Sequence, residues 1–201
     1  MYLAAWYAFR KLDFLFFIMT NLILKYPVST FFSINTKEPD GCFPLGEILE
    51  RIRSGFWKDQ VLPCRENKDF KTLLPVFTPT GIFRARGIAG MEQYNGLICL
   101  DIDNVTDPAE LRETCNHIPW VCAAFVTPGG QGVKVIIPTE ANPENYRQVE
   151  EEVAQAFQAL TGYERDRRCK DISRIQYVSY DPDLLIRESC RVFGKEDYVR
   201  V

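Results

Sequence analysis

The hydrophobic and polar positions of this chain follow two periods, one typical of strands and the other of helices. Runs rich in β-branched and apolar residues predict strands, and the central runs are apolar enough to be buried. We predict strands at residues 28–35, 96–103, 120–127, 133–138 and 174–180, with two shorter ones around a turn at residues 79–81.

Apolar residues three and four positions apart predict helices between these strands. One helix covers residues 45–54, a second begins at Pro108 with Thr106 or Asp107 as its N-cap, and a long third runs from residues 142–143 to Gly162. Helices and strands are mixed, and one connection is a tight hairpin. We therefore expect an α+β fold with a largely antiparallel central sheet and flanking helices.

The composition is that of one globular domain, which we assign to residues 25–201. The chain has 201 residues, 46% of them hydrophobic, and contains no repeat or flexible linker. Its net charge of −3 excludes a uniformly basic nucleic-acid coat but is compatible with a local basic cleft. The single histidine, His117, excludes His-rich metal sites. Seven cysteines without C-x-x-C spacing predict free thiols in a reducing cytosol, so we expect a cytoplasmic protein.

Residues 1–24 form an apolar N-terminal extension. Three charges at residues 10–13 interrupt it, and the uncharged run at 14–24 is shorter than the roughly 20 residues that a spanning helix needs. No Ala-x-Ala cleavage site follows the run, which disfavours a signal peptide. The segment is a docked helix, a weak membrane anchor or, as we favour, an extension upstream of a natural start at Met19. We expect no stable membrane insertion.

Two aspartates end the predicted strand at residues 96–103. Strand side chains alternate between the two faces of a sheet, so Asp101 and Asp103 share one face, while Leu100 and Ile102 point to the opposite side, toward the core. Neighbouring carboxylates repel each other, and a divalent cation is the usual resolution. Hard oxygen ligands suit Mg²⁺ or Mn²⁺, which nucleotidyl-transfer enzymes use in pairs about 3.5–4 Å apart. The alternative is that the aspartates begin a solvated turn.

A glycine-rich turn, TPGGQGVK, joins the next two strands and begins at Thr127. Gly129, Gly130 and Gly132 allow backbone N–H groups to approach an anion closely, as in a phosphate cradle. Lys134 lies among valines and isoleucines and requires an anionic partner, either a phosphate or the nearby aspartates. The alternative is an ordinary hairpin turn with Lys134 facing solvent.

Acids and bases alternate in the stretch DRRCKDISR, which runs into the last predicted strand. Asp166 or Asp171 could supply a third metal carboxylate, and Arg174 could hold a phosphate with two hydrogen bonds. The alternative is a solvated loop whose local ion pairs contribute little to stability.

These three signals occur in an order that resembles a known family. The stretches LPVFTPTGIFRAR, GLICLDIDNVTDPAELRE, AAFVTPGGQGVKVIIP and YERDRRCKDISRIQYVSYDPDL resemble the N-terminal domain of virulence-associated-E-like (VirE-type) proteins of bacterial mobile elements. That domain is similar to divergent members of the archaeo-eukaryotic primase, or primase-polymerase, superfamily. The resemblance covers residues 71–185 and implies an RRM-like α+β core.

The resemblance also implies roles for the acids. Asp101 and Asp103 match the pair that holds two catalytic Mg²⁺ or Mn²⁺ ions in that superfamily. Asp166 matches the third metal-binding acid best, and Asp171 is the alternative because it lies closer to Arg174 in the sequence.

The turn and the basic residues match the nucleotide-binding motifs by the same resemblance. The stretch from Gly129 to Lys134, preceded by Thr127, matches the motif that contacts the phosphates of the incoming nucleotide in that superfamily, although primases carry a histidine where this chain has Lys134. Arg174 joins this nucleotide-binding group, and Arg84 and Arg86 are candidates for contact with template or nucleotide.

The implied activity is metal-dependent transfer from a nucleoside triphosphate to a nucleic-acid 3′-hydroxyl, in mobile-element DNA replication. The expected partners are nucleoside triphosphates and a DNA template. Because the chain has no motor motif, any helicase or ATPase is expected on a separate chain or in a missing C-terminal part. The alternative is a catalytically inactive module that binds nucleic acid or a partner, which the Lys134 departure and the net acidic charge favour. A nuclease is a third reading of the same carboxylates.

Overall fold

The structure, a computed structural model, describes residues 23–168, 171–187 and 189–197. The predicted α+β class is confirmed, and every pair of named strands is antiparallel. The strands of this part of the chain are divided among two four-stranded sheets and one two-stranded sheet, rather than gathered in the one central sheet expected from the sequence.

The elements have the following bounds. The first sheet has the order β2 (Gly41–Pro44), β1 (Pro27–Phe31), β3 (Val76–Thr78) and β9 (Gln176–Tyr177). The second has the order β10 (Leu185–Ile186), β7 (Ala123–Val126), β8 (Gly132–Pro138) and β6 (Leu97–Asp103). The two-stranded sheet consists of β4 (Gly81–Phe83) and β5 (Met91–Tyr94). The α-helices are α2 (Leu45–Ser54), α3 (Lys58–Glu66), α4 (Pro108–Cys115) and α5 (Tyr146–Thr161), and the 3-10 helices are η1 (Lys68–Leu73), η2 (Ile88–Gly90) and η3 (Lys195–Asp197).

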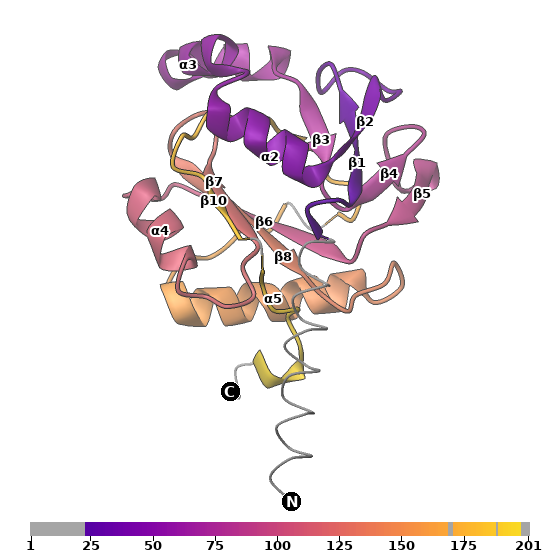
Figure 1. Cartoon of the computed structure of the whole chain (residues 1–201), viewed down its shortest axis with the longest axis vertical. Helices are drawn as coiled ribbons and strands as arrows, with labels where there is room; N and C mark the ends of the chain where they lie inside the picture. The colour runs from indigo at the N-terminus through magenta and orange to yellow at the C-terminus, as the bar shows by residue number, and fades with distance from the viewer. Residues whose placement is uncertain (1–22, 169–170, 188, 198–201) are drawn as a thin grey trace, which may run out of the picture.

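The second sheet lies between two layers of helices, with α2 and α3 on one face and α4 and α5 on the other (Figure 1). The two-residue period of a strand produces this division. In β6, Leu97 and Cys99 pack with α2 and α3, whereas Ile98 and Leu100 pack with α4 and α5. Because both faces are buried, the central strands have nearly continuous apolar sequences.

Helix α2 follows its predicted bounds. Its apolar stripe is fully buried and consists of Leu45, Ile48, Leu49 and Ile52. The helix ends at Gly55, whose φ of 84° is the left-handed conformation that glycine adopts without a steric penalty, and the Gly55 N–H donates to the carbonyl of Arg51.

The predicted start of the long helix is wrong by several residues. Helix α5 begins at Tyr146, because the Asn142 side-chain oxygen accepts hydrogen bonds from the N–H groups of Glu144 and Asn145. This side chain forms a turn in place of the first helical turn.

The strand predicted at residues 174–180 is mostly wrong, since only Gln176 and Tyr177 pair with another strand. Before them, the Arg174 N–H donates to the Asp171 carbonyl and closes a turn. After them, the Ser179 hydroxyl donates to a carbonyl of β7, in the other sheet. Hydrogen bonds outside the ladder therefore shorten this strand.

The predicted N-terminal extension lies outside the described residues, except for Ile23 and Leu24. Ile23 is buried beside α2, and the Leu24 carbonyl accepts a hydrogen bond from the N–H of Gly46. No helix in the described part of the chain is long and apolar enough to cross a membrane.

Candidate functional site

The register between β6 and β8 places Asp101 directly opposite Lys134. The Lys134 Nζ lies 2.6 Å from the Asp101 Oδ2, and the two side chains are only 4% and 15% exposed, respectively. Of the two anionic partners that the sequence allowed for Lys134, the structure therefore provides the aspartate. The predicted division of faces is confirmed, because Ile102 packs in the core with α4 and α5 while Asp101 and Lys134 meet on the opposite face.

A cavity of about 200 Å³ lies at the end of this ladder. Asp103, Thr127 and Gly129 line it, so the acidic strand end and the glycine turn meet there. Two basic side chains, Lys68 and Lys71, complete it from η1. We call this space the small cavity. Its other lining residues are Cys64, Asn104 and Gln131.

The glycine turn is fixed by a hydrogen bond within its own backbone and by the close packing of Gly132 against the backbone of β6. The Gly130 N–H donates to the Thr127 carbonyl and is therefore used within the turn, with Gly130 at a φ of 74°. A Cβ at Gly132 would lie 2.5 Å from the Ile102 carbonyl oxygen, so only glycine fits beside β6. At Gly129, by contrast, a Cβ would meet nothing within 4 Å.

Two side chains from the stretch after β9 support the strand that leads into this turn. The Asp181 carboxylate accepts the N–H of Val126 and pairs with Arg112 at 2.6 Å, and both side chains are largely buried. The Ser179 hydroxyl donates to the Val126 carbonyl. These residues of the SYDPDL stretch therefore fix the end of β7.

Asp166 lies beside Asp101, since its N–H donates to the Asp101 carbonyl at 2.7 Å. The preceding residue anchors this segment, because the buried Arg165 pairs with Glu150 and with Glu151 on α5. Burial lowers the pKa of Arg165, but hydrogen bonds and charge from the two glutamates outweigh burial and leave that pKa raised. The Asp166 carboxylate itself accepts hydrogen bonds from the main chain and side chain of Arg168.

Among the residues that the structure describes, no three His, Cys, Asp or Glu side chains are grouped closely enough to hold a metal ion. Asp101 is bonded to Lys134, and Asp166 to Arg168. Asp103 is exposed at the small cavity. Because strand side chains alternate between faces, Asp101 and Asp103 present their carboxylate oxygens on the same side of β6.

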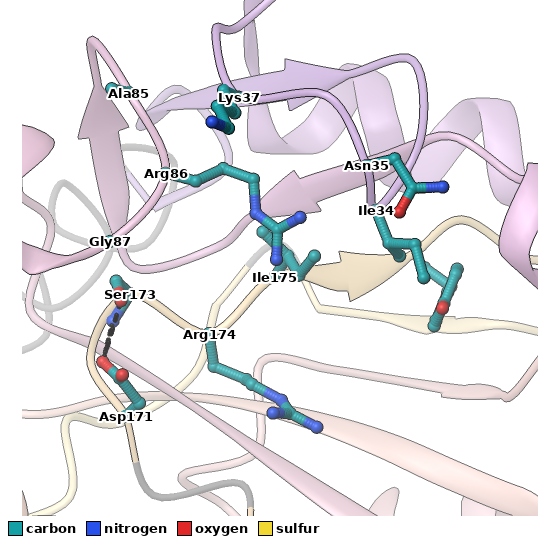
Figure 2. A pocket seen from close by; sticks show the side chains of 11 residues that line it. Ile34, Asn35, Lys37, Ala85, Arg86, Gly87, Asp171, Ser173, Arg174 and Ile175 are labelled. Atoms are coloured by element: carbon teal, nitrogen blue, oxygen red, sulfur yellow. Dashed lines mark hydrogen bonds between the residues drawn. The ribbon is translucent and has the colours of Figure 1, made fainter.

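Three of the other predicted residues, Arg86, Asp171 and Arg174, line a separate, larger cavity of about 820 Å³. Figure 2 shows Lys37, Arg86 and Arg174 around this large cavity, on three separate segments of the chain. Asp171 also lies here and accepts hydrogen bonds from the N–H and hydroxyl of Ser173. Arg174 and Asp171 therefore line a different cavity from Asp103 and the glycine turn.

Arg84, the remaining candidate, is exposed, and its N–H donates to the Gly90 carbonyl. It lines neither of these two cavities.

The two cavities are neighbours. Lys71 lines the small cavity, and its Nζ lies 4.8 Å from the ring centroid of Tyr177, which lines the large one. Burial raises the pKa of Tyr177, and the charges of Arg174 and Arg86 oppose this rise. Burial likewise raises the pKa of the Cys64 thiol in the small cavity, against the charge of Lys71.

Sequence reasoning missed three basic residues at these cavities. Lys68 and Lys71 are three positions apart, a spacing that places side chains on one edge of a 3-10 helix and could have revealed them. Lys37 lies in a connection between strands, and nothing in its local sequence marks it.

The fold and the site define an α+β domain with an acidic strand end, a glycine turn and two basic cavities. Residues 69–185, more than half of the chain, match the family model described as BT4734-like, N-terminal domain. The chain therefore belongs to the BT4734-like family, and the match covers β6, the glycine turn and the stretch that contains Asp166. No curated protein and no solved structure matches the chain.

Proposed function

We propose that this domain is a metal-dependent nucleotidyltransferase of the primase-polymerase type, with an RRM-like core. One observation carries the proposal. The β6–β8 ladder that contains the Asp101–Lys134 pair ends at a cavity lined by Asp103, the glycine turn and two lysines. Carboxylates for cations and lysines for phosphates are the two groups that nucleotidyl transfer requires side by side.

The donor chemistry at this strand end fits Mg²⁺ or Mn²⁺. Asp101 and Asp103 offer carboxylate oxygens on one face, and Asp166 is bonded to the same strand through its backbone. These three residues would hold the ions, whereas Asp171 lines the large cavity. Bound cations would supply charge stabilisation to the attacking and leaving oxygens of the displacement.

The remaining residues of the small cavity have roles that do not depend on the ions. Lys68 and Lys71 would neutralise the triphosphate as point charges. Thr127 and Gly129 would bring it close to the backbone of the turn. Lys134 would orient the largely buried Asp101 carboxylate through their ion pair. In this proposal the protein acts on a DNA template in the replication of a mobile element, in the cytoplasm, together with a helicase or ATPase on a separate chain or in a C-terminal part.

A template-dependent primer-synthesis assay with Mn²⁺ tests the proposal. We expect incorporation by the wild type and a loss of at least about 100-fold in Asp101→Asn and in Asp103→Asn, because removing a metal carboxylate removes transition-state stabilisation. Asp103 is exposed, so its variant should fold normally. Asp59→Asn, on the exposed start of α3, is the matched control and should retain wild-type activity.

Two outcomes would contradict the nucleotidyltransferase proposal. One is a wild-type protein that incorporates no nucleotide with any template or divalent cation. The other is equal incorporation by the wild type and both aspartate variants.

A second candidate is a catalytically inactive module that binds nucleic acid. The ion pair favours the inactive module, because Lys134 already compensates the negative charge of Asp101 without a metal ion. Calorimetric titration of the protein with a nucleoside triphosphate, in the presence and absence of Mn²⁺, separates the two candidate functions. An enzyme should bind the metal and nucleotide together and lose this in Asp101→Asn, whereas an inactive module should show no metal dependence.

A further inference from the structure

The large cavity concentrates positive charge that the proposed chemistry does not use. Lys37 comes from the β1–β2 connection, Arg86 from the segment between β4 and η2, and Arg174 from the segment before β9 (Figure 2). One acid, Asp171, lines the same space, and its carboxylate is bonded to Ser173. Three positive charges therefore face one negative charge.

These three cations form no salt bridge with a carboxylate among the residues described by the structure. Other basic side chains do have such partners, as in Arg112 with Asp181 and Arg165 with Glu150. Lys37, Arg86 and Arg174 are also exposed, so their charge is directed to solvent and to whatever enters the cavity. Uncompensated charges of one sign in a concave space focus the potential and attract a polyanion.

The backbone holds the cavity walls in place. The Arg86 N–H donates to the Lys37 carbonyl at 2.8 Å, which joins two of the basic segments. The third segment is held by the Thr80 hydroxyl, which donates to the Ile172 carbonyl at 2.7 Å. Ligand binding would therefore order the side chains only, which lowers its entropic cost.

The basic lining continues beyond the cavity. Tyr177 forms one wall, and the ammonium group of Lys71 lies over its ring, at the small cavity where Lys68 follows. Two apolar side chains, Ile34 and Ile175, also face the large cavity. A path with spaced cations and intervening apolar or aromatic groups suits a strand with regularly spaced phosphates and bases better than a small phosphorylated molecule.

We propose that the large cavity binds the phosphate backbone of single-stranded nucleic acid and directs the strand past Tyr177 to the small cavity. The strand's role as template rests on the proposed function, whereas its binding does not require catalysis. The cations would contact phosphates and not base edges, so binding should be independent of sequence.

Fluorescence anisotropy with labelled single-stranded DNA of about 16 nucleotides tests this proposal. We expect Arg86→Gln/Arg174→Gln to weaken binding on the order of tenfold, equally for unrelated sequences. The slope of log affinity against log salt should fall by about 0.7 for each phosphate contact removed. Both arginines are exposed, so thermal unfolding should be unchanged.

The matched control is Arg147→Gln/Lys195→Gln, which removes two exposed charges outside both cavities, on α5 and η3. It should change affinity less than twofold. Equal binding by wild type and Arg86→Gln/Arg174→Gln, equal losses in both double variants, or equally tight binding of a polyglutamate peptide would overturn the proposal.

The failure of this inference is distinguishable from that of the proposed function. Asp103→Asn, which should lower incorporation at least about 100-fold, leaves Arg86 and Arg174 in place, so it should not weaken binding of the strand. Strand binding without any incorporation contradicts the enzyme proposal alone. Incorporation with unchanged strand binding in Arg86→Gln/Arg174→Gln contradicts the cavity proposal alone.

Discussion

At the scale of single residues, the contact between Lys134 and Asp101 changes how both residues are interpreted. In the sequence, a lysine between apolar residues could face solvent, a phosphate or an acid. The antiparallel register sets it against Asp101, and both side chains are largely buried. Asp101 is therefore a largely buried ion-pair partner. Of the two aspartates, only Asp103 is exposed, as a residue of a solvated turn would be.

This pair makes a stability prediction. Lys134→Met leaves the Asp101 carboxylate buried without its counter-charge, so we expect the free energy of unfolding to fall by about 3–5 kcal/mol. Asp101→Leu/Lys134→Met, which removes both charges, should recover most of this loss. Urea denaturation measures both variants. A single variant within about 0.5 kcal/mol of the wild type would show that the pair contributes little.

At the scale of elements, the glycine turn and the two strands around it act as one unit. Gly132 pairs with Asp103 and lies against the Ile102 carbonyl, so the turn and the acidic strand end cannot move independently. Ser179 and Asp181 hold the other end of the turn through β7. The turn is thus a rigid wall of the small cavity.

Two alanine substitutions in the turn should differ sharply. Gly132→Ala places a Cβ against the β6 backbone, so we expect a loss of about 1–3 kcal/mol in unfolding free energy and weaker binding of a nucleoside triphosphate. Gly129→Ala is the control, because its Cβ would meet open space, and it should stay within about 0.5 kcal/mol of the wild type. Chemical denaturation and calorimetry give the two readouts. If both variants behave alike, the close approach at Gly132 has no energetic weight.

At the scale of the whole molecule, the described cysteines are free, and all of them except Cys42 are buried. Burial raises the pKa of Cys115 from its ordinary value of 9.0 to about 12, and that of Tyr94 from 10.0 to about 12. The two helix layers around the central sheet create this shift, because they exclude water from both faces.

These raised pKa values predict that stability decreases at alkaline pH. The unfolded chain releases these protons from about pH 9 upward, whereas the folded protein retains them until about pH 12. The unfolded state therefore binds fewer protons in this window, and the free energy of unfolding should fall as the pH rises through it. Urea denaturation across this range measures the slope. Cys115→Ala should flatten the slope, and Cys42→Ala, at an exposed site, should not.

The sequence by itself determined the elements whose signals are local. The apolar stripe of α2, the start of α4 at Pro108, and the shared face of Asp101 and Asp103 all follow from periodicity and helix-start signals within a few residues, whereas the choice of Asp107 over Thr106 as the cap came from the structure. Where side chains bond a distant backbone, as at residues 174–180, local patterning failed.

Only the tertiary structure decided which charged residues meet. The partner of Lys134 depends on strand register, and the position of Asp166 depends on the ion pair between Arg165 and α5. The grouping of Arg174 with Lys37 and Arg86 depends on three separate segments meeting at one cavity. Each contact joins segments far apart along the chain. The free energy of each contact comes from burial and charge pairing that exist only after folding. The local hydrophobic pattern of the sequence therefore cannot predict these contacts.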